Sequence, residues 1–341
     1  MGPGWERLWS VYGLWASFLI QGELDECDAL TNDTLARVRP GGRMHDAFAP
    51  GTGFVSFVRG DLAAARRDLA AYAAAIETFE LPASLPIPNH PLPIAICHQS
   101  YAEALAGELD LARATSDRAL AAAEVLTFPR GPFSQCYVLA LRAAIEFLAS
   151  DVAGALGFSA VQSEVAKRHG YTMWILIAEL QGAMVQDAVG VDGAAARAVE
   201  IMDELRSMGA VVWAPMWYAS LGQVKLLRGE LDEAARHIEA AADLARASGA
   251  HFWSAEIGRL EGLIELAQDP TSLQGVERCR DAAQLAERQG ARVFELRARL
   301  ALCQHSDDSA DLKALGELLE CQAWATLPEA ADAQRLVADR V

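Results

Sequence analysis

Residues 221–235 read LGQVKLLRGELDEAA, and this stretch decides the fold of the chain. Two apolar helical segments meet in it at the corner Gly229-Glu230-Leu231-Asp232. Glycine adopts the left-handed conformation that ends a helix at little cost, and an acidic residue is favourable beside the N-terminus of the next helix. The stretch therefore predicts two antiparallel helices joined by a tight turn.

The same corner recurs along the chain at Gly22, Gly60, Gly107, Ser150, Gly190 and Gly229. Successive corners are 38, 47, 43, 40 and 39 residues apart. A period near 40 residues that is built on a helical corner is typical of a solenoid of helical hairpins.

A second marker repeats independently of the corners. A glycine is followed four residues later by an aromatic residue in Gly170-Trp174, Gly209-Trp213, Gly249-Trp253 and Gly290-Phe294. Nine residues after each aromatic comes a small residue: Ala183, Gly222, Gly262 or Cys303. The small residue would let the two helices of a hairpin approach closely, and the aromatic residues are interpreted as packing between hairpins because their period is that of the repeat.

Residues around the best corner resemble the tetratricopeptide repeat. The matching positions are Tyr218, Leu221, Gly222, Gly229, Ala234, Ile238 and Ala241. The resemblance implies an all-α, right-handed superhelix (solenoid) of about eight antiparallel helical hairpins, forming one tetratricopeptide-like domain over residues 1–341. Five of the 13 prolines lie in residues 81–93, which are predicted to be irregular, either as a long loop or as a segment folded over the concave face.

A more specific resemblance extends over nearly the whole chain and is carried by residues 14–24, 249–262 and 290–298. They are similar to the C-terminal sensor region of bacterial signalling ATPases of the STAND type, which are associated with adenylate-cyclase or LuxR-type regulator domains. The chain contains no G-x-x-x-x-G-K-[ST] phosphate loop. The resemblance therefore implies the sensory arm of such a system without its ATPase.

Composition excludes several classes of partner. The net charge of −17 argues against nucleic acid and anionic membranes, both of which need a basic footprint. The six cysteines form no C-x-x-C pair, so we predict no metal site, no cofactor and a reducing compartment. The apolar run over residues 8–20 is too short to span a membrane and lacks the basic flank of a signal peptide, which predicts a cytoplasmic protein.

No catalytic residues are predicted. The sequence has no G-x-S-x-G motif, its seven histidines are dispersed, and adjacent Cys97 and His98 would point about 100° apart on a helix. We therefore expect a binding protein and not an enzyme.

The candidate binding residues lie on the predicted concave face, which the first helix of each hairpin lines in tetratricopeptide-like stacks. With Gly222 fixing the register, the candidates are Tyr101, Tyr137, Met216, Gln223, Glu256, Arg259 and Arg297. Glu256 and Arg259 are three residues apart, so an ion pair within one helix is the alternative to contact with a ligand.

The chain begins with a Trp-rich apolar helix, although a solenoid needs a polar cap at its ends. Trp5, Trp9 and Trp15 are therefore predicted to form an interface with an upstream domain or with a second copy of the chain, as a homodimer.

The predicted function is a non-enzymatic ligand-sensing or protein-interaction superhelix of a bacterial signalling or transcription-regulatory ATPase system. Its partner would be a protein or peptide in the concave groove, or an attached ATPase or cyclase effector domain. Two alternatives remain open: a stand-alone peptide-binding scaffold, and a small-molecule receptor whose groove residues 82–93 would enclose.

Overall fold

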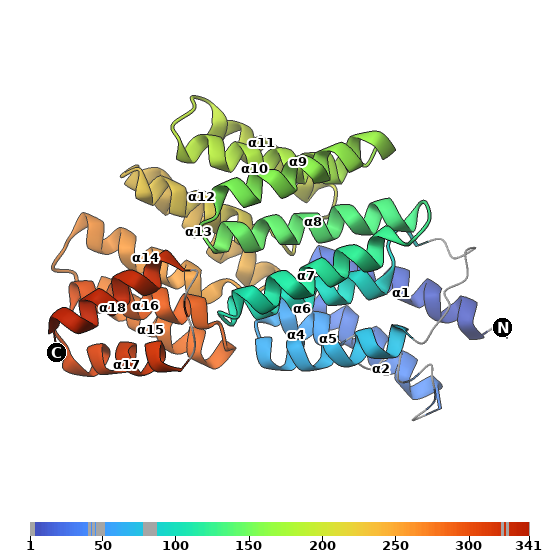
Figure 1. The fold of residues 1–341 in the computed structure, drawn as a ribbon, viewed down its shortest axis with the longest axis horizontal. Coiled ribbons are helices and arrows are strands. Elements are labelled where there is room, and N and C mark those ends of the chain that lie inside the picture. Colours follow the sequence, from blue (N-terminus) through green and yellow to red (C-terminus); the bar gives the residue numbers. More distant parts are fainter. Residues whose placement is uncertain are drawn as a thin grey trace.

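Helices make up all the regular structure of the residues that the computed structural model describes, which are 4–39, 42, 45, 52–77, 87–321, 324 and 327–340, with the backbone alone for 4–9 (Figure 1). The helices are α1 (Gly4–Gln21), α2 (Leu24–Arg37), α4 (Thr52–Arg59), α5 (Leu62–Glu77), α6 (Pro91–Leu105), α7 (Leu109–Glu124), α8 (Arg130–Leu148), α9 (Val152–His169), α10 (Thr172–Ala188), α11 (Ala194–Ser207), α12 (Ala214–Leu227), α13 (Leu231–Ser248), α14 (Ser254–Gln268), α15 (Leu273–Gln289), α16 (Arg292–His305), α17 (Ser309–Glu320) and α18 (Pro328–Arg340). The all-α fold class is confirmed.

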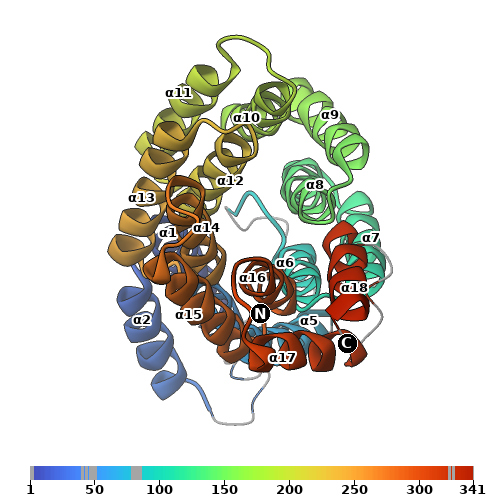
Figure 2. The same ribbon diagram turned by 90° about the vertical axis from the view of Figure 1, so that its left-hand side faces the viewer.

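The helices pair in chain order, from α1/α2 to α16/α17, and α18 follows as a last single helix. Figure 2 shows the pairs winding around a central space, with α6, α8, α10, α12, α14 and α16 nearest to it. The helices α7, α9, α11, α13 and α15 lie on the outside of the winding. The predicted superhelix of helical hairpins is confirmed, with the first helix of each pair on the inner side.

The corner glycines end their helices as the sequence predicts. Gly229 has φ +75°, its N–H donates to the carbonyl of Leu226, and the N–H of Glu230 donates to the carbonyl of Lys225, both at 2.9 Å. These two bonds satisfy carbonyls that the end of α12 would otherwise leave unpaired.

Ser150 occupies the same corner position without being a glycine, and it has φ +62°. A residue with a side chain pays about 1–2 kcal/mol to adopt the left-handed conformation, and glycine avoids this cost. Glycine also makes the unfolded chain more flexible, which offsets part of the stability gained. We expect Ser150→Gly to raise the free energy of unfolding by about 0.5–1 kcal/mol. Urea denaturation measures this, and Ser150→Ala, which keeps the strained Cβ, should give no gain.

The small residues between paired helices allow the close approach that the sequence predicts. A Cβ on Gly222 of α12 would lie 2.6 Å from Cδ1 of Ile238 on α13. A Cβ on Gly262 of α14 would lie 2.8 Å from the carbonyl oxygen of Gly275 on α15. Neither hairpin could close to this distance with a larger residue at these positions.

Successive turns of the superhelix contact each other through the loops that carry the Gly-x-x-x-Trp marker. The N–H groups of Val211 and Val212 both donate to the carbonyl of Ile20 at 3.0 Å, and that of His251 donates to the carbonyl of Val58 at 2.7 Å. Ile20 and Val58 lie in the last turns of α1 and α4, where helical carbonyls lack intrahelical partners. The loops before α12 and α14 therefore cap helices of the preceding turn.

The Pro-rich segment 81–93 is only partly irregular. Residues 81–86 lie outside the described residues, and 87–90 are non-helical. Pro91 and Pro93 belong to the first turn of α6, where His90 is the N-cap and its ring accepts the N–H of Leu92 at 3.2 Å. The prediction of irregular structure is wrong for 91–93, because proline is tolerated at helical positions whose N–H would have no partner in any case.

Candidate functional site

Two adjoining pockets open on the inner side of the superhelix, and we call them together the inner groove. Both are lined by Ala144, Gln181, Met216 and Trp217. The first pocket adds Tyr101, Ala143, Phe147, Ala155, Leu156, Ser159, Met184, Val185, Ser220 and Trp253. The second adds Ile20, Tyr137, Ala140, Leu141, Met173, Trp174, Ile177, Ala210 and Trp213.

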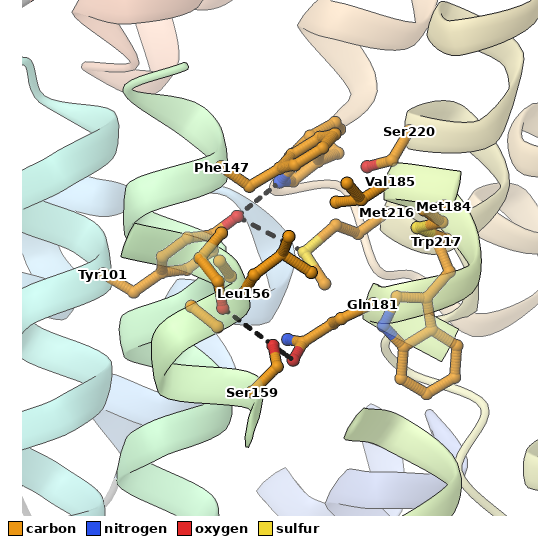
Figure 3. Close-up of a pocket in the computed structure, with 14 residues that line it drawn as sticks. Tyr101, Phe147, Leu156, Ser159, Gln181, Met184, Val185, Met216, Trp217 and Ser220 are labelled. Atoms are coloured by element: carbon orange, nitrogen blue, oxygen red, sulfur yellow. Dashed lines mark hydrogen bonds between the residues drawn. The ribbon is translucent and has the colours of Figure 1, made fainter. Parts of the chain in front are cut away.

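Consecutive hairpins build the inner groove, as Figure 3 shows for the first pocket. Helices α8, α10 and α12 contribute to both pockets, and α9 adds Leu156 and Ser159 to the first. The two pockets enclose about 510 and 480 Å³ of space between side chains, part of which is open to solvent. The inner face is therefore not lined by first helices alone.

Few polar groups in the inner groove are free. Ser159 donates to Oε1 of Gln181 at 2.6 Å, and Nε2 of Gln181 donates to the carbonyl of Ala140 at 3.1 Å. The indole N–H of Trp217 and the hydroxyl of Ser220 make no hydrogen bond with any described residue. A ligand could engage these two groups, and the buried indole N–H of Trp174, which also has no partner, without breaking an internal bond.

Tyr101 and Met216, predicted separately as binding residues, meet at the wall of the first pocket. The Tyr101 hydroxyl accepts the indole N–H of Trp253 at 3.1 Å and donates to Sδ of Met216 at 3.3 Å (Figure 3). Burial raises the pKa of Tyr101, so the phenol stays protonated. The three side chains join α6, α12 and the loop before α14 across the central space.

Tyr137 lines the second pocket and a third pocket beyond it, between α1, α4, α6 and the loop before α12. Its hydroxyl lies 3.3 Å from Nε2 of His98, whose Nδ1 lies 2.8 Å from the carbonyl of Ile94. A carbonyl only accepts, so Nδ1 carries the proton and Nε2 accepts from Tyr137. Burial lowers the pKa of His98 to about 4, which keeps this neutral ring in place at pH 7.

Glu256, Arg259 and Arg297 come together, but in a buried ion cluster outside the inner groove. Arg259 donates to both carboxylate oxygens of Glu256 at 2.7 and 2.8 Å, and Nη1 of Arg297 lies 3.3 Å from Glu256. Arg297 also donates to Glu329 at 2.8 Å and to the carbonyl of Leu148 at 2.9 Å. Glu256 is fully buried and the two arginines are 7% exposed.

The ion pair within α14 is thus present, and all three charged side chains already have partners. The cluster joins α14, α16 and α18 to the end of α8, which gives these residues a structural role. Gln223 is half-buried and lines none of the three pockets. Whether any of these four residues touches a ligand stays a prediction, and their placement does not favour it.

Three groove residues, Trp217, Ser220 and Gln181, are not among the predicted binding residues. The groove side of α12 carries Met216, Trp217 and Ser220, whereas the expected register selected Met216 and Gln223. The helix is rotated by part of a turn relative to that register. The spacing i, i+1, i+4 of Met216, Trp217 and Ser220 is the signal that could have found this face.

The periodic aromatic residues pack between hairpins, as interpreted from their period. Trp174, Trp213, Trp253 and Phe294 are all 9% exposed or less, and Trp253 lies edge-on to Phe294 with ring centres 5.2 Å apart. Three of them, the tryptophans, also form walls of the inner groove. The three tryptophans therefore both pack between hairpins and line the groove.

Trp15 is buried within the chain and does not belong to the predicted N-terminal interface. Its side chain is 4% exposed and lies edge-on to Phe54 with ring centres 5.6 Å apart. The expectation that Trp15 faces a partner is wrong, because the side chain packs within the chain. The side chains of Trp5 and Trp9 lie outside the described residues, so their part in an interface stays a prediction.

The described residues show neither a metal-binding group nor a membrane-spanning helix. They contain no group of three or more His, Cys, Asp or Glu side chains arranged to hold a metal ion. None of their helices combines the length and the apolar character needed to cross a bilayer.

Solved structures of similar fold cover nearly the whole chain. A Rap protein complexed with competence and sporulation factor aligns with a TM-score of 0.64 at 12% identity, over 98% of this chain and 92% of that one. The Rap conjugation gene regulator of plasmid pLS20, in complex with the Phr* peptide, aligns with a TM-score of 0.57 at 12% identity, over 98% and 96%. Aspartyl phosphate phosphatase F from Bacillus subtilis aligns with a TM-score of 0.52 at 7% identity, over 98% and 94%.

At these identities the likeness establishes the fold alone. The chain has the helical-repeat superhelix of the Rap proteins. No family model matches its sequence, and no curated protein matches it significantly.

Proposed function

We propose that this chain is a regulatory protein that captures a short, extended peptide segment in the inner groove. The observation that carries the proposal is the groove itself: two joined apolar pockets on the inner face of a complete superhelical turn. Pockets of this kind can take the side chains of an extended segment.

The comparisons support a peptide over other ligands. Two of the similar structures, which share the fold over 92% and 96% of their length, are described as complexes, one with competence and sporulation factor and one with the Phr* peptide. The stand-alone peptide-binding scaffold, an alternative at the level of the sequence, is therefore favoured over the ATPase-linked sensor. The other alternative, a small molecule enclosed by residues 82–93, is tested by the experiment described below.

Peptide capture can alter the superhelix because the second pocket spans two of its turns. Ile20 belongs to α1, whereas Met173 and Trp217 come from hairpins of the next turn. The carbonyl of Ile20 also accepts two of the hydrogen bonds that join these turns. A peptide bound there would shift the superhelix between a wider and a narrower spacing of its turns. The size of this shift is limited by the difference between the peptide's affinities for the two spacings.

An attached ATPase or cyclase domain, which the sequence resemblance implies, would be one domain that responds to such a change in spacing. This part of the proposal is tested separately by the DNA upstream of the codon for Met1. A continuous reading frame with a phosphate loop would support it, and a separate upstream gene would remove it.

Affinity selection from a random heptapeptide library tests the peptide proposal, with two variants of one helix as the pair. Leu156 and Val161 are both exposed apolar residues of α9, at 39% and 49%, but only Leu156 lines the groove. We expect Leu156→Arg to weaken binding of a selected peptide about tenfold or more, because it places a charge in an apolar wall.

Val161→Arg should leave that affinity unchanged. Equal effects of the two variants, or failure of any library member to bind, would overturn the proposal. A parallel thermal-shift screen of uncharged small molecules would then decide whether the pocket takes one of them.

A further inference from the structure

We infer that the captured segment is uncharged at its centre and carries two neighbouring bulky apolar side chains, aliphatic or aromatic. The inference rests on the proposed function and names the chemical class of the ligand.

Among the residues that the structure describes, no charged side chain lines either pocket of the inner groove. The buried charges around Glu256 are paired with one another by four ion contacts among Glu256, Arg259, Arg297 and Glu329. A cationic or anionic ligand side chain would therefore lose its water without gaining an opposite charge, which is costly. For an acidic ligand, the net charge of −17 on the protein adds repulsion.

The two pockets meet at Ala144, so groups that fill them lie next to each other on the ligand. Met216 and Trp217 form the wall common to both. Methionine is flexible and polarisable and so fits differently shaped apolar groups, and tryptophan offers a large flat contact surface. Two bulky neighbouring side chains match this arrangement better than one.

Main-chain recognition contributes little in this groove. An extended peptide that joins a sheet edge gains a row of backbone hydrogen bonds, but the described residues contain no strand. The free polar groups are the indole N–H groups of Trp174 and Trp217 and the hydroxyl of Ser220, and none of them accepts in a row as a sheet edge does. Burial of ligand side chains must then supply most of the affinity, which makes their apolar character decisive.

The test compares selected heptapeptides with synthetic copies in which one central apolar residue becomes lysine or glutamate. We expect enrichment of adjacent bulky uncharged residues, and about tenfold or greater loss of affinity for either charged copy. Glutamate should cost more than lysine. Titration is followed by tryptophan fluorescence, since Trp217 lines both pockets.

A charge introduced into the groove gives a gain-of-binding readout that misfolding cannot mimic. Leu156→Glu should move the selected sequences toward a lysine or arginine at one central position, whereas Val161→Glu should not. Enrichment of charged centres by the unaltered protein would overturn this inference and leave peptide capture standing. Absence of any enriched peptide would overturn the proposed function itself.

Discussion

Glu256→Gln lowers the free energy of unfolding by about 3–5 kcal/mol, because it leaves the charges of Arg259 and Arg297 buried without their shared partner. Glu256 is fully buried and accepts from both guanidinium groups, at 2.7 to 3.3 Å. Glutamine keeps the volume of the side chain and removes only its charge, so lost packing contributes little. Guanidinium chloride denaturation followed by circular dichroism measures the change.

The exposed pair of Asp243 and Arg246 is the matched control, since it is also an i, i+3 pair on one helix. Its side chains are 62% and 73% exposed, so Arg246→Ala should leave stability nearly unchanged. A loss below about 1 kcal/mol in Glu256→Gln would show that the cluster does not hold α14, α16 and α18 together.

The same cluster predicts a dependence of stability on pH. Burial alone would raise the pKa of Glu256, but Arg259 and Arg297 beside it hold that pKa below its ordinary value. The unfolded chain then binds this proton first on acidification. The stabilisation is present above the ordinary carboxyl pKa and is lost as the pH falls through the lower folded-state pKa. Glu256→Gln should show a smaller loss of stability than the unaltered protein over that interval.

Gly262→Ala lowers the free energy of unfolding by about 1–3 kcal/mol, which is the usual cost of forcing extra volume into a packed interface. The added Cβ would lie 2.7 Å from Sγ of Cys279 and 2.8 Å from the carbonyl oxygen of Gly275. Backbone atoms cannot move aside as a side chain can, so α14 and α15 must separate. Denaturation curves of the two proteins measure the difference.

Gly258→Ala is the control on the same helix. A Cβ there would meet only Cβ of Ala282, at an ordinary 3.6 Å. Alanine favours the helix over glycine by about 1 kcal/mol, so this variant should be equally stable or more stable. If both variants gained stability, the small residue would not be what sets the spacing of the hairpin.

The sequence predicts local geometry well because local rules govern it. Corner glycines, helix starts and the small residues at 222 and 262 follow from conformational preference and from a 40-residue period. Contacts between turns of the superhelix do not follow from such rules. Tyr101 and Trp253 are 152 positions apart, and only the pitch of the whole winding brings their side chains together.

The candidate site was partly predictable for the same reason. Tyr101, Tyr137 and Met216 lie on the inner side because they belong to first helices of their hairpins. Glu256 and Arg297 also lie on first helices, yet the closing of the winding buries them against α8 and α18. A periodic pattern identifies the side of a helix that faces inward, but it does not show where the inner space stays open.

The most direct test of peptide capture in the inner groove is a photo-crosslink. A selected heptapeptide that carries benzophenone at a central position is irradiated with the protein, and the modified residues are identified by mass spectrometry. We expect crosslinks to residues of the groove on α8, α10 and α12, with Met216 among them. Crosslinks confined to the outer helices α7, α11, α13 and α15 would contradict it.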